Sequence, residues 1–336
     1  MVLVTWPGFD PDDRATGEQL RRGGLELRLA PKLGMRTPDE MPGLLEGAVA
    51  AIVSTDPFDR SVFAAAPQLR AIARVGVGVD SIDLQAATDA GVAVATTPGA
   101  NNQTCADHAV ALMLAAIRRV LENDASVRAG DWDRAGLLTP WDLHGKTVGI
   151  VGLGDIGRAV ADRLAGFGTT IVVTDPAVPA SDGYTTLELD DLLERADIVS
   201  LHVPLSDSTQ RMIGARELAR IGPAGVLVNT SRGALVEETA LLDALENGRL
   251  RAAALDVFAD EPPPLDRLGR LPNVVLSPHI AGLSEESIRA MTRQATRNVL
   301  DVLARRITPA LLNPEVLGGG SAREATARTL TGEVAE

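Results

Sequence analysis

The fold of this 336-residue chain is decided by the stretch Lys146-Thr-Val-Gly-Ile-Val-Gly152-Leu-Gly154-Asp-Ile-Gly157-Arg158. Thr147 to Val151 predict a short buried strand, and apolar periodicity predicts a helix from Gly157 to about Gly168. A second strand is expected over Thr170 to Thr174 and ends at Asp175. A strand, a glycine-rich turn, a helix, a second strand and an acidic residue are, in that order, typical of a dinucleotide site.

Each glycine of the turn has a physical reason in such a site. Gly152 allows the tight turn, Gly154 lets the backbone approach a pyrophosphate, and Gly157 lets the helix pack closely on the strand. The free N–H groups at the helix N-terminus then face the phosphates. Asp175 is placed to accept hydrogen bonds from the adenosine ribose, and it would repel the 2′-phosphate of NADP. Because Pro176-Ala177-Val178 supplies no arginine to offset that repulsion, NAD is predicted over NADP.

Composition limits the other possibilities. Apolar residues make up 45% and charged residues 23% of the chain, as in ordinary globular proteins, and the length suits two domains. A formal net charge of −13 argues against nucleic acid and anionic membrane surfaces as partners. The longest apolar run, Ala109 to Ile117, is too short to cross a bilayer. The single cysteine, Cys105, and four scattered histidines predict a cytoplasmic protein with neither a disulfide nor a metal site.

Strands and helices alternate along most of the chain, which predicts α/β architecture with parallel sheets. Strands are expected near 51–54, 71–75, 92–95, 198–202, 225–229, 252–257 and 274–277, and helices near 60–66, 188–195, 217–221, 237–247 and 285–304. A further helix, Thr104 to Leu121, has apolar residues nearly all round and is expected to be buried between layers or subunits. The small-residue stretch after Asn313-Pro314 predicts a mobile tail.

Four charged or titratable side chains follow predicted strands, where open α/β sheets collect their ligands. They are Arg232, Asp256, Glu261 and His279. A histidine suits the exchange of a hydroxyl proton, a carboxylate beside it would orient the ring, and an arginine can grip a carboxylate through two parallel N–H donors. Taken singly, each residue has a structural reading as a surface cation, a turn residue or a solvated acid. Together they predict interconversion of a 2-hydroxy acid and a 2-keto acid, with Asp256 steadying Arg232 or tuning the pair of histidine and glutamate.

The other histidines are weaker candidates. His202 precedes Pro204 in a loop expected beside the cofactor. His108 lies within the helix predicted to be buried and is interpreted as a packing residue, while His144 is assigned to a linker.

These motifs together resemble the D-isomer-specific 2-hydroxyacid dehydrogenase family, especially its phosphoglycerate dehydrogenase-like branch. The likeness covers roughly residues 51–314. The segments that carry it are Arg74-Val-Gly-Val-Gly-Val-Asp-Ser-Ile-Asp83, Gly91-Val-Ala-Val-Ala-Thr-Thr-Pro-Gly99, Gly152-Leu-Gly-Asp-Ile-Gly157, Asn229-Thr-Ser-Arg-Gly233, Asp256-Val-Phe, Asp260-Glu-Pro262 and Pro278-His279.

The resemblance implies which residues form the site. The catalytic residues would be Arg232, Glu261 and His279. Substrate would be bound by Arg232 and His279, by Arg74, and by a backbone loop that cradles its carboxylate and consists of Val75, Gly76, Val77 and Gly78. The family's cofactor contacts carry over to Asp155, Ile156, Asp175, Thr104, Pro204 and Thr230. The predicted cofactor site also includes the glycines of the turn, Gly152, Gly154 and Gly157, and the strand-end candidates His202 and Asp256.

The resemblance also implies the architecture, two Rossmann-like or flavodoxin-like parallel-sheet domains with a cleft between them. A discontinuous substrate-binding domain would comprise residues 1–99 and 285–314, an NAD-binding Rossmann domain residues 100–284, and a mobile tail residues 315–336. Hinge closure over the cleft would exclude water during hydride transfer. Family members are usually homodimers, and the apolar helix from Thr104 fits a buried interface.

Departures from the family pattern leave the substrate open. Phosphoglycerate enzymes carry an arginine on an early strand-end loop that helps to hold the phosphate, where this chain has Ser54 followed by an unhelpful Asp56. After the histidine, Leu283-Ser284 replaces a common Ala-Thr pair and would reshape the pocket wall. Phosphoglycerate is therefore not favoured over hydroxypyruvate, glyoxylate or a larger 2-keto acid. Glu261 argues against a formate dehydrogenase, because those relatives replace the acid partner of the histidine.

The resulting interpretation is an NAD-dependent oxidoreductase that transfers a hydride between nicotinamide and C2 of a D-2-hydroxy acid or 2-keto acid. One alternative is an NAD-sensing scaffold or corepressor of the same fold, which can retain the arginine, glutamate and histidine. Another is an enzyme of different chemistry, such as an amino-acid dehydrogenase. That chemistry would need an amine site, and neither Lys32 nor Lys146 lies near these strand ends.

Overall fold

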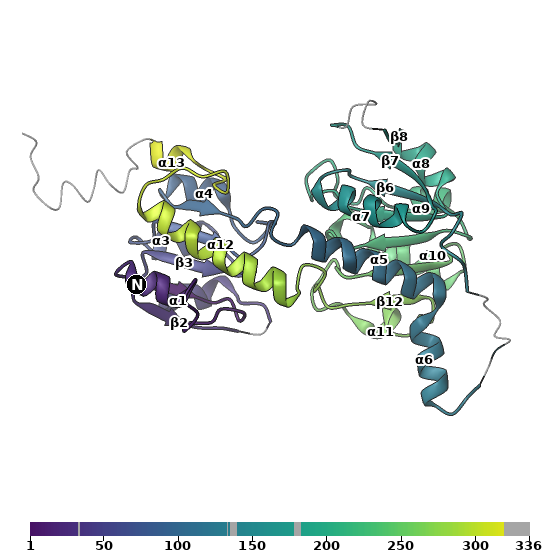
Figure 1. Cartoon of the computed structure of the whole chain (residues 1–336), viewed down its shortest axis with the longest axis horizontal. Helices are drawn as coiled ribbons and strands as arrows, with labels where there is room; N and C mark the ends of the chain where they lie inside the picture. The colour runs from purple at the N-terminus through teal and green to yellow at the C-terminus, as the bar shows by residue number, and fades with distance from the viewer. Residues whose placement is uncertain (33, 133, 135–139, 178–182, 319–336) are drawn as a thin grey trace, which may run out of the picture. The chain divides into compact units, whose positions relative to one another are not determined.

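The computed structural model describes residues 1–32, 34–132, 134, 140–177 and 183–318 (Figure 1). Contacts divide the chain into two units. Unit 1 consists of Met1–Asn101 and the segment that begins at Ser284, and unit 2 is Asn102–Leu283. In the described part of the chain, none of the helices combines the length and the apolar character needed to cross a membrane.

Unit 1 is built on a five-stranded parallel sheet with strand order β2-β1-β3-β4-β5. Its strands are β1 (Val2–Val4), β2 (Leu27–Leu29), β3 (Ala50–Val53), β4 (Ala71–Arg74) and β5 (Ala93–Ala95). Alternate residues enter two separate cores, since Val2 and Val4 pack on one face of the sheet and Leu3 on the other. This double burial is typical of parallel sheets and explains the continuous apolar runs in the sequence.

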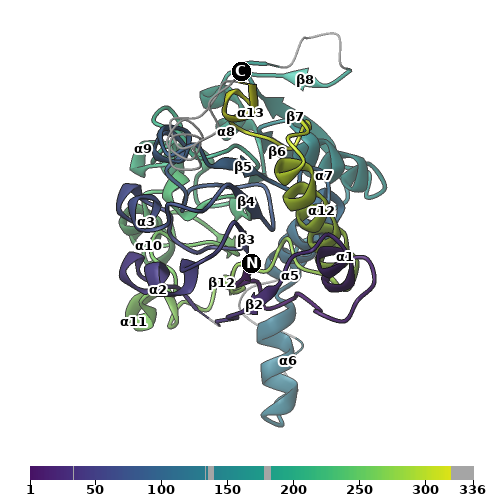
Figure 2. The ribbon, with the colours of Figure 1, turned by 90° about the vertical axis from the view of Figure 1, so that its left-hand side faces the viewer.

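Helices cover both faces of this sheet (Figure 2). On one face lie α1 (Gly17–Arg22) and α12 (Glu285–Leu303), and on the other lie α2 (Met41–Leu45), α3 (Arg60–Ala65) and α4 (Leu84–Asp89), with the short η1 (Pro38–Glu40) before α2. Ser284 caps α12 by accepting a hydrogen bond from the Ser287 N–H at 3.1 Å. The prediction of a mobile tail from residue 315 is wrong for residues 315–318. Residues 315–318 form α13 (Glu315–Gly318), and Val316 is buried in the unit 1 core, whereas 319–336 lie outside the described residues.

Unit 2 has a seven-stranded parallel sheet with strand order β12-β11-β10-β9-β6-β7-β8. The strands are β6 (Thr147–Val151), β7 (Thr170–Thr174), β8 (Thr185–Thr186), β9 (Ile198–Leu201), β10 (Val226–Asn229), β11 (Ala252–Leu255) and β12 (Val274–Leu276). On one face pack α5 (Asn102–Arg118) and α7 (Asp155–Ala165), and on the other α8 (Leu189–Arg195), α9 (Ala215–Ile221), α10 (Glu238–Glu246) and α11 (Leu265–Leu268). The predicted α/β fold with parallel sheets is confirmed.

The long helix predicted from Thr104 to Leu121 is wrong at its end. α5 stops at Arg118, and Arg119 adopts the left-handed conformation with φ 54°. The chain then continues as α6 (Val120–Arg128), which buries none of its residues and extends away from the sheet of unit 2 (Figure 1). Apolar periodicity alone did not reveal this break, because the residues after it are also apolar.

Candidate active site

The glycine-rich turn joins β6 to α7, which begins at Asp155, two residues before the predicted start. Gly152 has φ 91°, and a Cβ there would lie 2.8 Å from the carbonyl oxygen of His202. A Cβ on Gly157 would lie 2.1 Å from the carbonyl oxygen of Gly152. At Gly154 a Cβ would meet no described atom within 4 Å. The fold therefore needs glycine at the first and third positions, while the second faces open space beside the free N–H groups of the first turn of α7.

Asp175 lies at the carboxyl end of β7, directly beside this turn. Its Oδ2 accepts a hydrogen bond from the Leu153 N–H at 2.8 Å, and its Oδ1 accepts one from the Ala177 N–H at 2.8 Å. The carboxylate is thus held at the edge of the turn, and each oxygen keeps a second lone pair for another donor.

The ends of β9 and β10 bring three further predicted residues to the same edge of the sheet. Burial lowers the pKa of His202 to about 4, and its Nε2 lies 2.8 Å from the Ser200 hydroxyl. His202 is therefore neutral at physiological pH and unsuited to donate a proton in catalysis. Pro204 is exposed, and the hydroxyl oxygen of Thr230 is buried without a hydrogen-bond partner in the part of the chain that the structure describes. A buried hydroxyl of this kind is suited to a ligand.

His279 and Glu261 form a hydrogen-bonded pair, with 2.7 Å between His279 Nδ1 and Glu261 Oε2. Glu261 Oε1 also accepts from the Phe258 N–H at 3.1 Å. Burial raises the pKa of Glu261, but the hydrogen bond and charge of His279 and the Phe258 N–H outweigh it and leave this pKa below the ordinary value. Because a carboxylate only accepts hydrogen bonds, Nδ1 carries the proton of this hydrogen bond, and Nε2 takes no part in it.

Arg232 follows β10 and leads into η3 (Gly233–Leu235). Buried Asn229 shapes this turn, since its Nδ2 donates to the Arg232 carbonyl at 2.8 Å and its Oδ1 accepts from the Ser231 N–H at 3.0 Å. The Cys105 thiol of α5 lies close enough to be affected by two charges of the site. The pKa of Cys105 is raised to about 11, mainly by burial and also by the charge of Asp256, against the lowering effect of the Arg232 charge.

Asp256 is fully buried at the end of β11 and holds the turn that carries His279. Its Oδ1 accepts from the Ser277 hydroxyl at 2.5 Å and the Ile280 N–H at 3.0 Å, and its Oδ2 accepts from the Ala281 N–H at 2.7 Å. Asp256 therefore anchors the backbone turn of His279, whereas its predicted roles of steadying Arg232 or tuning the histidine–carboxylate pair stay predictions. A contact between Asp256 and a cofactor stays a prediction, as do the roles of Thr104, Asp155 and Ile156.

In unit 1 the predicted carboxylate loop, Val75 to Gly78, follows β4. The Val75 N–H donates to the Val53 carbonyl at 2.8 Å, and the Gly76 N–H donates to the Thr97 hydroxyl at 2.8 Å. Two of the four N–H groups expected to cradle a carboxylate thus already have partners, and a cradle would depend on Val77 and Gly78. Arg74 folds back over the loop and donates from Nη1 to the Val75 carbonyl at 2.8 Å.

A buried ion pair that the sequence did not predict lies beyond the end of β3. Arg36 Nε is 3.1 Å from Asp56 Oδ1, and the two side chains are 6% and 9% exposed. Asp56 Oδ2 also accepts from the Thr5 hydroxyl at 2.6 Å. Asp56 is therefore paired with an arginine from the loop after β2. This pair lies at the strand end where phosphoglycerate enzymes carry an arginine and this chain has Ser54.

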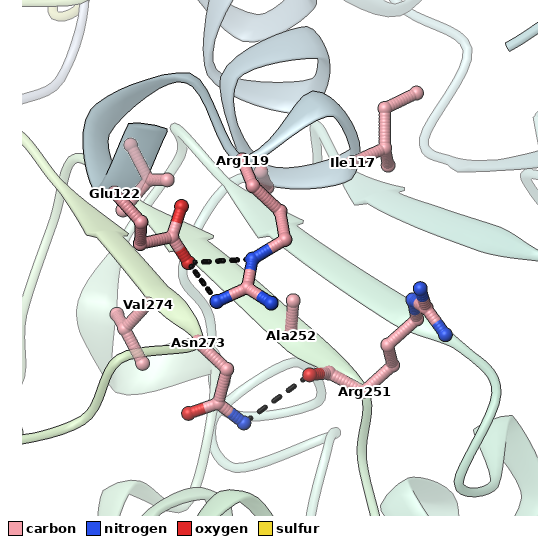
Figure 3. Close-up of a pocket in the computed structure, with 9 residues that line it drawn as sticks. Ile117, Arg119, Glu122, Arg251, Ala252, Asn273 and Val274 are labelled. Carbon is pink, nitrogen blue, oxygen red and sulfur yellow. Dashed lines mark hydrogen bonds and ion pairs between the residues drawn. The ribbon is translucent and has the colours of Figure 1, made fainter. Parts of the chain in front are cut away.

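A pocket in unit 2 lies at the opposite, amino-terminal ends of β11 and β12 (Figure 3). Arg119 and Glu122 form an ion pair at 3.1 Å on its wall, and Asn273 donates to the Arg251 carbonyl at 3.2 Å. None of the predicted site residues lines this pocket. Among the residues that the structure describes, no group of three or more histidine, cysteine, aspartate or glutamate side chains is arranged to hold a metal ion.

A parallel sheet with a glycine-rich turn at its switch point, and ionisable side chains at neighbouring strand ends, are typical of nicotinamide-dependent oxidoreductases. Residues 110–281 match the family model described as D-isomer specific 2-hydroxyacid dehydrogenase, NAD binding domain. The chain belongs to the D-isomer specific 2-hydroxyacid dehydrogenase family, as its sequence predicts.

Individual relatives agree with this assignment. A glyoxylate reductase from Korarchaeum cryptofilum is 45% identical over 278 residues, which cover 80% of this chain and 83% of that protein. D-3-phosphoglycerate dehydrogenase from Mycobacterium tuberculosis is 41% identical over 294 residues, 86% of this chain and 55% of that protein. The crystal structure of the TT0316 protein from Thermus thermophilus matches with a TM-score of 0.85 and 40% identity, covering 93% of this chain and 99% of that one.

The cofactor named for similar structures varies. An NADPH-dependent glyoxylate/hydroxypyruvate reductase from Sinorhizobium meliloti matches with a TM-score of 0.79 and 31% identity, over 93% of this chain and 96% of that one. A nicotinamide cofactor and a small 2-hydroxy or 2-keto acid substrate therefore follow from the family, without the choice between NAD and NADP.

Proposed function

We propose that this protein is an NAD-dependent D-2-hydroxyacid dehydrogenase that reduces small 2-keto acids, with His279 and Glu261 as the acid/base pair and Arg232 as the carboxylate anchor. The observation that carries the proposal is the 2.7 Å hydrogen bond between His279 and Glu261 at the strand ends of unit 2. A histidine oriented by a carboxylate is a general arrangement for proton transfer near neutral pH.

In reduction, the carbonyl oxygen of the keto acid takes a proton from His279 Nε2 while C2 accepts a hydride. Bound nicotinamide supplies that hydride. Glu261 stabilises the imidazolium before transfer through its carboxylate charge, and the neutral ring regains a proton from solvent afterwards. Arg232 binds the substrate carboxylate through two N–H donors and so orients the keto group. In oxidation the same residues act in reverse, with His279 as the base.

The residues around the glycine turn fit a dinucleotide. Gly154 leaves room where a pyrophosphate would approach α7, and the buried Thr230 hydroxyl has no hydrogen-bond partner among the described residues. Asp175 supports NAD over NADP, because a 2′-phosphate would be brought against its carboxylate. We expect kcat/KM for NADH to exceed that for NADPH at least tenfold, about 1.4 kcal/mol. Asp175→Ser should reduce this ratio, and an enzyme that prefers NADPH before mutation would contradict the assignment.

The Arg36–Asp56 pair supports a substrate without a phosphate group. Arg36 brings a guanidinium near the end of β3, but the Asp56 carboxylate offsets its charge. We therefore propose glyoxylate or hydroxypyruvate, rather than 3-phosphohydroxypyruvate, as the preferred class of substrate.

The direct test follows NADH absorbance with a panel of glyoxylate, hydroxypyruvate, 3-phosphohydroxypyruvate, pyruvate and longer 2-keto acids. We expect turnover of at least one small keto acid and a D-2-hydroxy acid as product, identified by chiral chromatography. NADH binding without turnover of any keto acid would reject the enzyme and point to the scaffold alternative. A best rate with the phosphorylated acid would reject only the substrate choice.

A homodimer is also proposed, because α6 exposes half or more of Val120, Leu121 and Val127. Clustered apolar side chains on an unburied helix are typical of an interaction surface. Light scattering should give twice the chain mass, and Val127→Asp should reduce it. A monomeric wild-type protein would refute this proposal. The cytoplasmic location stays a prediction.

A further inference from the structure

The turn from Ser277 to Ala281 holds His279 in an unusual backbone conformation. His279 has φ 53°, in the left-handed region that non-glycine residues rarely adopt. Three consecutive N–H groups of the turn donate to the single residue Asp256. His279 N–H donates to its main-chain carbonyl at 2.8 Å, and the N–H groups of Ile280 and Ala281 donate to its carboxylate. The geometry of His279 therefore depends on how firmly Asp256 is held.

Asp256 is held in turn by the Ser277 hydroxyl, whose Oγ is 2.5 Å from Oδ1. Burial raises the pKa of Asp256, but nearby His108 and the hydrogen bonds from Ser277, Ile280 and Ala281 leave it below the ordinary value. The carboxylate is thus ionised at neutral pH and only accepts hydrogen bonds. Because a serine has one hydroxyl proton, that proton lies between Ser277 and Asp256.

This assignment fixes the role of His108 on α5. Its Nε2 lies 2.9 Å from Ser277 Oγ and 3.5 Å from Asp256 Oδ1. Since Ser277 has already donated its only proton to the carboxylate, the hydroxyl oxygen can only accept from the ring. His108 Nε2 therefore carries a proton, and donors run in one direction from His108 through Ser277 to Asp256.

We propose that His108 is a positioning residue for His279, which it orients through Ser277 and Asp256. This inference rests on the proposed function, because it gives His279 a reaction to perform. It replaces the interpretation of His108 as a packing residue. The difference between the two roles is chemical: a packing residue needs only the right volume, whereas the proposed chain needs an N–H donor at the position of Nε2.

The test compares His108→Leu, which fills similar space without a donor, with His108→Gln, whose amide restores a donor. We expect His108→Leu to lower kcat about tenfold, because a small displacement of His279 impairs proton transfer. KM for NADH should be unchanged, and His108→Gln should recover most of the rate. His144→Leu is the matched control, because His144 lies on the surface, where its Nδ1 contacts the Phe167 carbonyl, and it should leave kcat unaltered.

Ser277→Ala provides a second variant that keeps His108. It should show the same loss of kcat, and combining it with His108→Leu should cost no more than Ser277→Ala alone, since both break one chain. A wild-type rate in His108→Leu would overturn the proposal. So would a His108→Gln variant as slow as His108→Leu, or fully additive losses in the double variant.

Nitrogen NMR of the imidazole groups gives a readout that does not depend on turnover. We expect a proton on Nε2 of His108 at neutral pH, and a proton on Nδ1 alone would overturn the chain. If the wild-type protein reduces no keto acid, the proposed function fails. The NMR measurement still decides whether the His108 chain exists, so the two failures are distinguishable.

Discussion

Asp56 in unit 1 and Asp256 in unit 2 are both buried aspartates just beyond the ends of parallel strands, yet they are neutralised differently. Asp56 is paired with the guanidinium of Arg36 at 3.1 Å. Asp256 accepts hydrogen bonds from a hydroxyl and two backbone N–H groups, and His108 Nε2 lies 3.5 Å from its Oδ1.

The difference separates a structural role from an organising one. A full positive charge cancels the field of Asp56 locally, so its main effect is to fasten the loop of Arg36 to the sheet. Neutral donors stabilise the Asp256 carboxylate without cancelling its negative charge. That charge therefore affects the pKa values of neighbouring groups. It contributes to raising the pKa of Cys105 and opposes the lowering of the pKa of Glu261. The hydrogen bonds that the Asp256 carboxylate accepts also shape the turn that carries His279.

The largest expected effect tests whether unit 2 contains the proton donor. His279→Asn should lower kcat for glyoxylate about 10³-fold, because an amide cannot supply the proton. The affinity for NADH, measured by fluorescence titration, should stay the same. His144→Asn is the control for loss of a histidine at an exposed site. Retention of full activity by His279→Asn would remove this residue from the mechanism.

Next in size is the effect of breaking the buried ion pair in unit 1. Asp56→Asn should lower the free energy of unfolding by about 3 kcal/mol, since it leaves the Arg36 guanidinium buried without a counter-ion. Denaturant unfolding measures this change, and the rate per folded molecule with glyoxylate should change little. Asp12→Asn is the matched control, because Asp12 is exposed and 3.7 Å from Arg21. A large drop in the rate of Asp56→Asn with an unchanged free energy of unfolding would contradict the structural role assigned to Asp56.

The corresponding substitution in unit 2 should affect catalysis more than folding. Asp256→Asn exchanges one accepting oxygen for a donor that faces the N–H groups of the 277–281 turn, and we expect kcat to fall about 30-fold, or 2 kcal/mol. Steady-state kinetics with varied NADH checks this. If the only change were a higher KM for NADH, Asp256 would be a cofactor contact instead of an anchor for the turn.

The smallest expected effect is a change in thermal stability at acidic pH. The hydrogen bonds to Asp256 hold its pKa below 3.8, its value in the unfolded chain, so its stabilisation is complete above about pH 5 and is lost as the pH falls through the folded pKa. The difference in Tm between wild type and Asp256→Asn should therefore be constant from about pH 7 to pH 5 and shrink below pH 4. Calorimetry with rescans for reversibility measures it. A gap that stays constant down to pH 3 would show that Asp256 does not contribute through its charge.

Much of unit 2 could be predicted because the signals are local. Gly152 and Gly157 occupy positions where a Cβ would strike the backbone, so spacing alone indicated the turn. The strand ends at Arg232 and His279 were recognisable because parallel strands all deliver their carboxyl ends to one edge. The break at Arg119 was not predictable, because one residue in a left-handed conformation leaves no mark on apolar periodicity.

The sequence by itself determined the fold class, the glycine turn with Asp175, and the family, since these depend on residues close in the chain or on patterns shared by every strand. Only the tertiary structure decided the partners of the two buried aspartates. Arg36 reaches Asp56 from another loop, and His108 reaches Ser277 across a separation of 169 residues. Such pairs depend on how helices and loops pack over a sheet. Hydrogen bonding is decided by distances of a few tenths of an ångström, which spacing along the chain does not encode.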